Sequence, residues 1–393
     1  MEKDWRWFGR KDKITLPMLR QIGVEGIVTS LHDLPIGEVW TVGQISEVKD
    51  YIEANGLRWS VVESLPVSEE IKYAGPRRDA LIENYRQSLA NLGKCGVRTV
   101  CYNFMPVIDW IRTDLEYPCP DGSTSLYFDL AEFAYFDIHI LERKDAAKDY
   151  SRDVLARVKR LAESFTDADR ERLIDTIIIK TQGFVNGNFA GHDFDPVGLF
   201  REMLSKFEGI TKDALRENLR YFLEAVMPVC EEYGIRLCIH PDDPPMPVLG
   251  LPRIVTSAED IEWILKAVDN PHSGLTFCAG SLSSGAHNEL VPMARRFASR
   301  TFFVHLRSCD VLPGGNFMEA SHTAGRAHLV ELIRIFEKQD PELPMRVDHG
   351  KTILGDEACG YNPGYSFHGR MLALGQVDGM MAAVRNEIEH KLI

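Results

Sequence analysis

The chain has 393 residues, of which 45% are hydrophobic and 26% charged, and its formal net charge is −13 at pH 7. This composition is typical of a folded enzyme with a large core, and it argues against long disordered stretches. The negative charge argues against a protein that holds nucleic acid through a broad basic face, so we expect no nucleic-acid partner. It still allows a local basic pocket for a small anion.

The N-terminal sequence and the cysteines indicate the compartment. The opening residues, MEKDWRWFGRKDK, are charged and aromatic and contain no apolar stretch of signal-peptide length. No run elsewhere approaches a membrane span, so we expect a cytoplasmic protein without a membrane partner. The eight cysteines form no CxxC pair, which predicts reduced thiols.

A unit of amphipathic helix, glycine and apolar strand recurs along the chain. Helical patterns at residues 48–55, 81–94 and 215–233 each stop near a glycine and lead into an apolar strand. Seven strand patterns result, at residues 26–29, 57–62, 98–102 and 235–240, and in the runs that end at Cys278, His305 and Asp348. This alternation predicts an α/β protein, and we interpret it as a (β/α)₈ TIM barrel. We expect a short eighth strand between about 359 and 378.

The segment from about 105 to 214 breaks this rhythm, because it is rich in turn residues and in charged helical patterns. We interpret it as a partly helical insertion between the third and fourth strands, within a single domain that spans residues 1–393. It is expected to fold over the barrel mouth or onto a partner subunit. A weaker alternative makes the apolar residues 177–179 a strand of their own.

Four of the apolar runs end on residue types that bind metal ions. In a closed barrel the carboxyl ends of the strands surround one mouth, so side chains at these positions converge. Each residue alone has an ordinary explanation as part of the core, but the shared position on four successive strands favours a mononuclear metal site. The four candidate ligands are His240, Cys278, His305 and Asp348. We interpret Asp242 and Asp243, in the turn after His240, as solvated.

The mixed soft and hard donor set suits a divalent transition metal rather than Ca²⁺ or Mg²⁺. His349 follows Asp348 directly, so one of the two can bind metal while the other reaches a substrate. Arg307 follows His305 by two residues and therefore shares its face if the strand continues. There it either clamps a substrate carboxylate or forms a structural ion pair.

Long, idiosyncratic strings run through nearly the whole chain. They are RWFG and VVES near the N-terminus, YNFMPVIDWIRTDLEYP in the centre, and HPDDPP, LGLPRI, TFCAGS, FFVHLRS, RVDHG and NPGYS in the C-terminal half. Together they resemble the D-mannonate dehydratase family, whose fold is similar to the xylose-isomerase-like barrels.

This resemblance implies a carbon–oxygen lyase, a hydro-lyase of hexuronate catabolism. Its substrate would be a sugar acid, D-mannonate, which loses water to give 2-dehydro-3-deoxy-D-gluconate. The family's metal, Mn²⁺ or Fe²⁺, is held by His, Cys, His and Asp, which match the four strand-end residues named above. The resemblance also implies a homo-oligomer, a dimer or larger.

The resemblance places an acid–base pair at His349 and at Tyr365 in the NPGY string. A tyrosine base needs its pKa lowered, by the metal or by a cation such as Arg370. We expect Arg370 and Arg307 to bind substrate, and we assign Asn103, at the end of a strand, to the substrate hydroxyls.

Three other functions compete with this interpretation. A sugar isomerase of the xylose-isomerase-like superfamily shares the scaffold, but its carboxylate-rich sites usually hold two metals, which the Cys278 ligand argues against. A metal-dependent apurinic endonuclease would require a basic approach surface. A non-catalytic sugar-acid binding protein would not need His349 beside a metal ligand.

Overall fold

The computed structural model describes residues 1–182 and 195–392. Eight parallel strands close into a barrel in the order β1-β12-β9-β8-β7-β4-β3-β2, which confirms the predicted (β/α)₈ fold. The barrel strands are β1 (Glu2–Arg6), β2 (Gly26–Thr29), β3 (Arg58–Glu63), β4 (Thr99–Tyr102), β7 (Arg236–Ile239), β8 (Ser273–Cys278), β9 (Thr301–Leu306) and β12 (Pro344–Val347). Strands such as β8 and β9 are buried throughout, because helices cover the outside of the barrel and side chains fill its interior.

The eighth barrel strand is β1 at the N-terminus, so our expectation of a strand between 359 and 378 is wrong. β1 pairs in parallel with β12 on one side and with β2 on the other. Its sequence, EKDWR, has no apolar run, because every residue except Trp5 is charged, and only Trp5 joins the large core. Residues 359–378 instead form a loop and the start of helix α15 (Phe367–Glu389).

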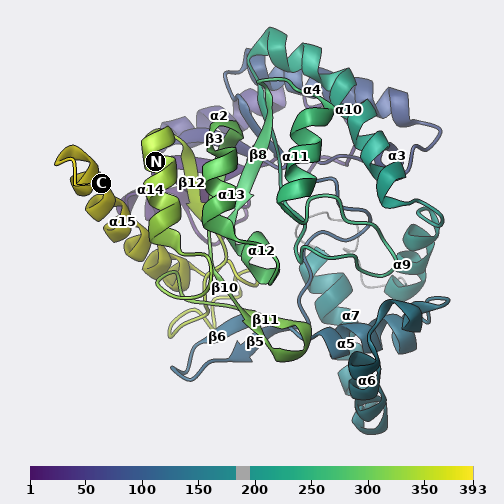
Figure 1. Ribbon diagram of the computed structural model, residues 1–393. Coiled ribbons are helices and arrows are strands. Elements are labelled where there is room, and N and C mark those ends of the chain that lie inside the picture. The colour runs from purple at the N-terminus through teal and green to yellow at the C-terminus, as the bar shows by residue number, and fades with distance from the viewer. Residues whose placement is uncertain (183–194, 393) are drawn as a thin grey trace.

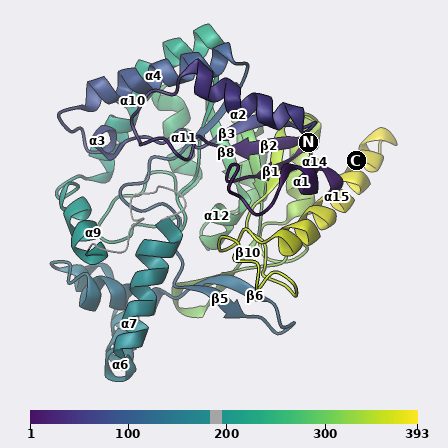
Figure 2. The ribbon, with the colours of Figure 1, turned by 180° about the vertical axis from the view of Figure 1, so that it is seen from behind.

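Helices surround the barrel and connect its strands (Figures 1 and 2). Besides α15 they are α1 (Leu16–Gln21), α2 (Val42–Ala54), α3 (Glu69–Lys72), α4 (Arg78–Lys94), α10 (Lys212–Tyr233), α11 (Ala258–Ala267), α12 (Ala279–Ser284), α13 (Leu290–Phe297), η4 (Ala298–Arg300) and α14 (Leu329–Gln339). Helix α10 ends at Gly234 with φ 66°, a left-handed conformation that glycine adopts without strain. In the described part of the chain, no helix combines the length and apolar character needed to traverse a membrane.

The segment between β4 and β7 departs from the barrel pattern. Because β1 adds a strand at the start, this segment lies between the fourth and fifth barrel strands rather than the third and fourth. It contains a hairpin, β5 (Asp114–Pro118) and β6 (Thr124–Phe128), followed by α5 (Leu130–Tyr135), η1 (Phe136–Ile140), η2 (Ala146–Asp149), α6 (Arg152–Ser164), α7 (Asp167–Ile174), η3 (Asp175–Lys180) and α9 (Pro196–Ser205). Residues 177–179 lie in the π-helix η3, so the strand alternative is wrong.

A second sheet joins this segment to the barrel. Strands β10 (Cys309–Leu312) and β11 (Asn316–Glu319), which follow β9 after a short turn and are linked by η5 (Pro313–Gly315), pair with the hairpin in the order β10-β11-β6-β5. The helices α5, α6 and α7 gather beside this sheet at the lower end of Figure 1. Together with the sheet and η1, they build a second apolar cluster that includes Phe128 of β6, Phe136 of η1 and Phe317 of β11. The sheet therefore fixes both segments at the carboxyl end of the barrel.

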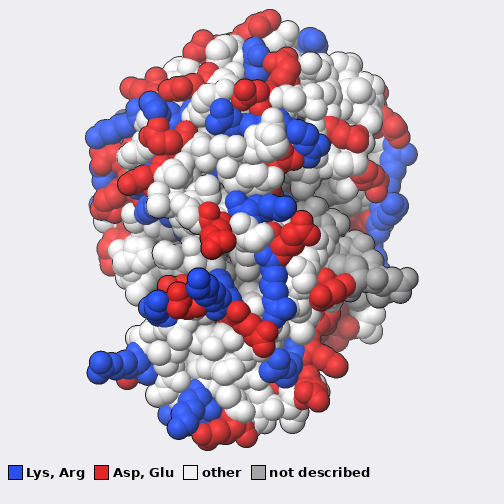
Figure 3. Space-filling view, turned by 90° about the vertical axis from the view of Figure 1, so that its right-hand side faces the viewer, with Lys and Arg blue, Asp and Glu red and all other residues white. Residues whose placement is uncertain are grey.

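The surface carries charges of both signs. Figure 3 shows Lys and Arg interspersed with Asp and Glu over the face at the right of Figure 1, so the described residues on this face present both signs of charge side by side.

Candidate metal centre and active site

A cavity opens at the carboxyl ends of the barrel strands. Strands β1, β3, β4 and β12 line it together with the segments that follow β7, β8 and β9. Asp109 and Trp110, which follow β4, form another part of its wall. Of the four predicted ligands, His240 and Asp348 line this cavity. Cys278 and His305 are fully buried next to them, in contact with Asp348 and His240 respectively.

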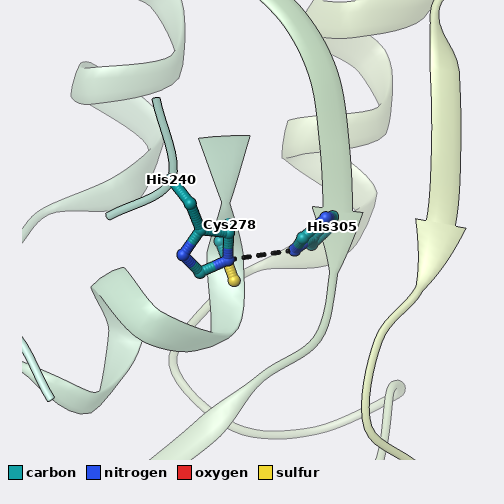
Figure 4. Close-up of side chains that lie close together, drawn as sticks. All are labelled: His240, Cys278 and His305. Carbon is teal, nitrogen blue, oxygen red and sulfur yellow. Dashed lines mark hydrogen bonds between the residues drawn. The ribbon is translucent and has the colours of Figure 1, made fainter. Parts of the chain in front are cut away.

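Three of the four predicted ligands form a compact group. His240 follows β7, Cys278 ends β8 and His305 lies in β9, and one ligand atom from each lies within 4.8 Å of the other two. The Nε2 atom of His240 is 3.3 Å from the Nδ1 atom of His305, and a dashed line marks this contact in Figure 4. His240 Nδ1 lies 2.7 Å from the Pro241 carbonyl oxygen, which can only accept a hydrogen bond. Its Nε2 is thus left without a proton in the neutral ring, as a metal ligand requires.

Asp348, the fourth predicted ligand, borders this group. Its Oδ2 atom lies 3.6 Å from Cys278 Sγ and 3.9 Å from His305 Nδ1. Two arginines also bind the carboxylate, Arg346 through Nη1 at 2.5 Å and Arg307 through Nε at 3.1 Å. The structure therefore brings all four residues together. Three form the compact group, and Asp348 lies at its edge, where its carboxylate also pairs with the two arginines.

The electrostatics of the group fit a bound cation. Burial alone would lower the pKa of His240, but Cys278 and Glu63 raise it to about 10. Burial and Arg346 lower the pKa of His305 well below its ordinary value. With no cation bound, these charges would favour a second ring proton on His240 beside a neutral His305 at neutral pH, and a cation held by the same donors would take the place of that proton. Two imidazoles, a thiol and a carboxylate are a donor set suited to a transition metal.

Arg307 lies at the centre of a buried ion network. It donates to Asp243 through Nη2 at 2.8 Å and to Glu319 through Nη1 at 2.5 Å. Arg112 also binds both carboxylates, at 2.7 and 2.8 Å. A Cβ at Gly280 would collide with the Arg307 guanidinium, so only glycine leaves it room. Arg307 therefore forms structural ion pairs, the second of the two roles predicted for it, rather than holding its guanidinium free for a substrate carboxylate. Its side chain still lines the cavity.

The interpretation of Asp242 and Asp243 as a solvated turn is wrong. Both are almost fully buried, at 1% and 2% exposure. Asp242 pairs with Arg253 at 3.2 Å, and Asp243 pairs with Arg112 and Arg307. The partners of Asp243 lie 131 and 64 positions away in the sequence, so the local pattern of charged and proline residues could not reveal them.

His349 and Tyr365 lie side by side in the cavity wall. Their rings meet edge to face with centroids 5.1 Å apart. His349 Nδ1 lies 2.7 Å from Glu319 Oε1 and 2.5 Å from Arg307 Nη1, which directs the opposite edge of the ring away from the network. Burial raises the pKa of Tyr365 above its usual value, and this effect outweighs that of Arg346. Two groups able to exchange protons thus adjoin the candidate ligands.

Comparisons with known proteins identify the family. The family model described as D-mannonate dehydratase (UxuA) matches residues 1–391. The chain belongs to the D-mannonate dehydratase family.

Relatives of known name agree with this assignment. The chain is 46% identical over 398 residues to the mannonate dehydratase of Marinomonas sp. (strain MWYL1), covering 99% of this chain and 100% of that protein. It is 44% identical to the mannonate dehydratase of Chromohalobacter salexigens, covering 98% and 99%. The crystal structure of mannonate dehydratase from Streptococcus suis serotype 2 is similar with a TM-score of 0.78 and 34% identity, covering 99% of this chain and 96% of that one. D-Mannonate dehydratases are hydro-lyases, so the family places the cavity in an enzyme.

The two remaining predicted substrate residues differ in position. Asn103, which follows β4, lines the cavity and donates from Nδ2 to Asp109 Oδ2 at 2.9 Å. Arg370 is fully buried but is absent from the cavity wall. Its nitrogens donate to the backbone carbonyls of Ser366, Arg6 and Tyr365. Arg370 therefore positions the segment around Tyr365, and our expectation that it contacts substrate is not supported by its geometry.

Sequence reasoning did not single out three charged residues of the site. Arg346 precedes Asp348 by two, so the alternation that linked Arg307 to His305 would have found it. Its Nε and Nη2 atoms bind the two carboxylate oxygens of Glu63, at 2.9 and 3.0 Å. Glu319, on β11, and Arg6, on β1, lie outside the recognised strand pattern, although Arg6 begins the RWFG string.

The ion network predicts a loss of stability in acid. Burial alone would raise the pKa of Glu319, but Arg307, His349 and Arg112 lower it to about 2. The pKa of a glutamate in the unfolded chain is about 4.3. Because the folded pKa is the lower of the two, this carboxylate stabilises the fold fully above about pH 4.5 and loses that contribution, on the order of 3 kcal/mol, as the pH falls toward 2. Urea unfolding at pH 7 and pH 3 measures the loss. The difference between the two pH values is expected to shrink in Glu319→Gln, and an equal difference in both proteins would contradict the assignment.

Proposed function

We propose that the chain catalyses the dehydration of D-mannonate to 2-dehydro-3-deoxy-D-gluconate. The observation that carries the proposal is that His240, which forms the compact group with Cys278 and His305, lines the same cavity as His349 and Tyr365 in a chain from this family. The substrate is a sugar acid, and we expect the enzyme to work in the cytoplasm.

The proposed cofactor is one Mn²⁺ or Fe²⁺ ion, held by His240, Cys278, His305 and Asp348. When bound, such an ion supplies Lewis acidity that stabilises negative charge on the substrate as its carbon-2 proton leaves. The imidazoles and the thiol favour a transition metal over Mg²⁺.

In the proposed reaction, His349 and Tyr365 divide the proton transfers. One group removes the proton from carbon 2, the electron pair of that C–H bond forms the C2–C3 double bond, and the hydroxyl on carbon 3 leaves with a proton as water. The enol product then becomes the 2-keto acid. Because burial keeps the proton on the Tyr365 hydroxyl at neutral pH, we assign Tyr365 as the acid and His349 as the base.

An assay of the metal-loaded protein tests this function. Incubation with D-mannonate is expected to yield 2-dehydro-3-deoxy-D-gluconate, measured as a 2-keto-3-deoxy acid. D-Altronate, the epimer at carbon 3, would give the same product but presents its leaving hydroxyl on the other side. We expect it to react at least about 100-fold more slowly, because a misplaced group loses the aligned proton donor. Interconversion of an aldose and a ketose would indicate the isomerase, and binding of D-mannonate without turnover would indicate a binding protein.

We further propose that residues 1–393 form one domain in which residues 105–214 are a cap, and that the protein is a homo-oligomer. The second, antiparallel sheet supports the first part, because it pairs β6 of this segment with β11, one of the two strands that follow barrel strand β9. Two cavity residues, Asp109 and Trp110, also come from the same segment.

A further inference from the structure

Arg6 lies at the barrel mouth and has no role in the proton transfers proposed above. It is the last residue of β1, and the alternation of a strand sets it on the face opposite to the core residue Trp5. It lines the reaction cavity together with Glu63, Tyr365 and His349. Its side chain therefore belongs to the space where a substrate would lie.

The guanidinium of Arg6 has no counter-charge within bonding distance in the described structure. The residue is only 7% exposed, and its Nη1 atom is buried without a hydrogen-bond partner. The other two arginines of the cavity wall differ, since Arg307 and Arg346 each bind carboxylates. The close contact of Arg6 is with the ring of Phe8, whose centroid lies 5.2 Å from the guanidinium carbon. A buried cation in this state is costly unless a ligand supplies the missing acceptor.

The nearby carboxylate of Glu63 does not fill this role. Both of its oxygens accept hydrogen bonds from Arg346, at 2.9 and 3.0 Å. Burial lowers the pKa of Arg6 even though Glu63 and Tyr365 act in the opposite direction. The fork of Arg6 donors thus remains available to an anion that enters the cavity.

We propose that Arg6 binds the carboxylate of the sugar-acid substrate and thereby selects acids over neutral sugars. A planar guanidinium pairs with a carboxylate through two parallel hydrogen bonds, which a hydroxyl group cannot reproduce. The proposal rests on the proposed function, because it takes D-mannonate as the ligand. It adds a specificity residue from β1, the strand that the sequence pattern did not reveal.

Two measurements on Arg6→Gln test this assignment. The variant is expected to lower kcat/KM for D-mannonate by roughly 30- to 1,000-fold, mainly through KM, as for loss of one partner of a buried charge pair. The second measurement compares equilibrium binding of D-mannonate and of D-mannitol, which has the same carbon configuration but no carboxylate. The wild-type protein is expected to prefer the acid, and Arg6→Gln is expected to lose that preference while binding D-mannitol as before.

Matched variants separate binding from folding. Arg10→Gln removes an arginine four residues away that is exposed and pairs with Glu47, and it is expected to leave both measurements unchanged. Arg6→Ala is expected to regain activity when guanidinium chloride is added, beyond the effect of equal sodium chloride. If Arg6→Gln does not fold, Arg6→Lys replaces it, because lysine keeps the positive charge but lacks the two parallel donors of a guanidinium. Arg6→Lys is expected to show a smaller loss of kcat/KM and of binding for D-mannonate, and unchanged binding of D-mannitol.

Two results would overturn the assignment: unchanged kinetics in a folded Arg6 variant, or equal losses for the acid and for D-mannitol. Failure of the proposed function looks different, since the wild-type protein would then leave D-mannonate unchanged. The binding comparison of acid and polyol would still test Arg6 in that case.

Discussion

Replacing His349 by Asn is expected to lower kcat for D-mannonate by roughly 10²- to 10⁴-fold, the usual loss when a general acid or base is removed. The asparagine amide can occupy the position of Nδ1 and keep the hydrogen bond to Glu319, which is 2.7 Å long in the native protein. It cannot take up a proton near neutral pH. Because His349 is not one of the grouped ligands, metal content measured by elemental analysis is expected to stay at the wild-type level.

A histidine at the other end of the barrel provides the control. His272 precedes β8 at its amino end, and its Nδ1 atom lies 2.7 Å from the Ile235 carbonyl oxygen. His272→Asn is expected to retain turnover and metal. Near-normal turnover in His349→Asn would remove this residue from the proton transfers, and loss of metal in that variant would make it a ligand instead.

The strand ends of the C-terminal half could be predicted from the sequence because their signal is local. An apolar run predicts a buried strand, and parallel strands in a barrel share one open end, so the next polar residue faces the mouth. This reasoning placed His240, Cys278 and His305 correctly around a common space. It needed no knowledge of which distant segments touch.

Features that depend on distant partners could not be predicted in the same way. Strand β1 is held by hydrogen bonds to β12 and β2, and its charged sequence hid it until those neighbours were known. Asp243 resembles a solvated residue in its local context, but Arg112, which lies 131 positions earlier, buries and neutralises it. Glu319 reaches the site because β11 pairs with β10, which follows β9, and with β6 of the segment after β4. Such pairs arise from the closed topology, which a linear pattern does not specify.

Replacing Cys278 by Ala is expected to reduce metal affinity by more than the roughly 10- to 100-fold that removal of a residue supporting a ligand costs. The thiol ends β8 inside the group of three, where it lies 3.6 Å from Asp348 Oδ2. Removing it leaves two imidazoles and the Asp348 carboxylate, whose negative charge is already partly neutralised by Arg307 and Arg346. Elemental analysis of the purified variant, and titration of the metal-free protein with Mn²⁺, measure the change.

The variant also tests whether the loss is local. Cys278 Sγ accepts hydrogen bonds from Ser281 N and Oγ at the start of α12, so its removal is expected to cost only about 1 kcal/mol of stability, as for a helix cap. Cys230→Ala removes an equally buried thiol from α10 in the main core and is expected to keep full metal content. Unaltered metal binding in Cys278→Ala would exclude the thiol from the ligands. The site would then rest on His240, His305 and Asp348, two imidazoles and a carboxylate that still suit Fe²⁺ but include no soft sulfur donor.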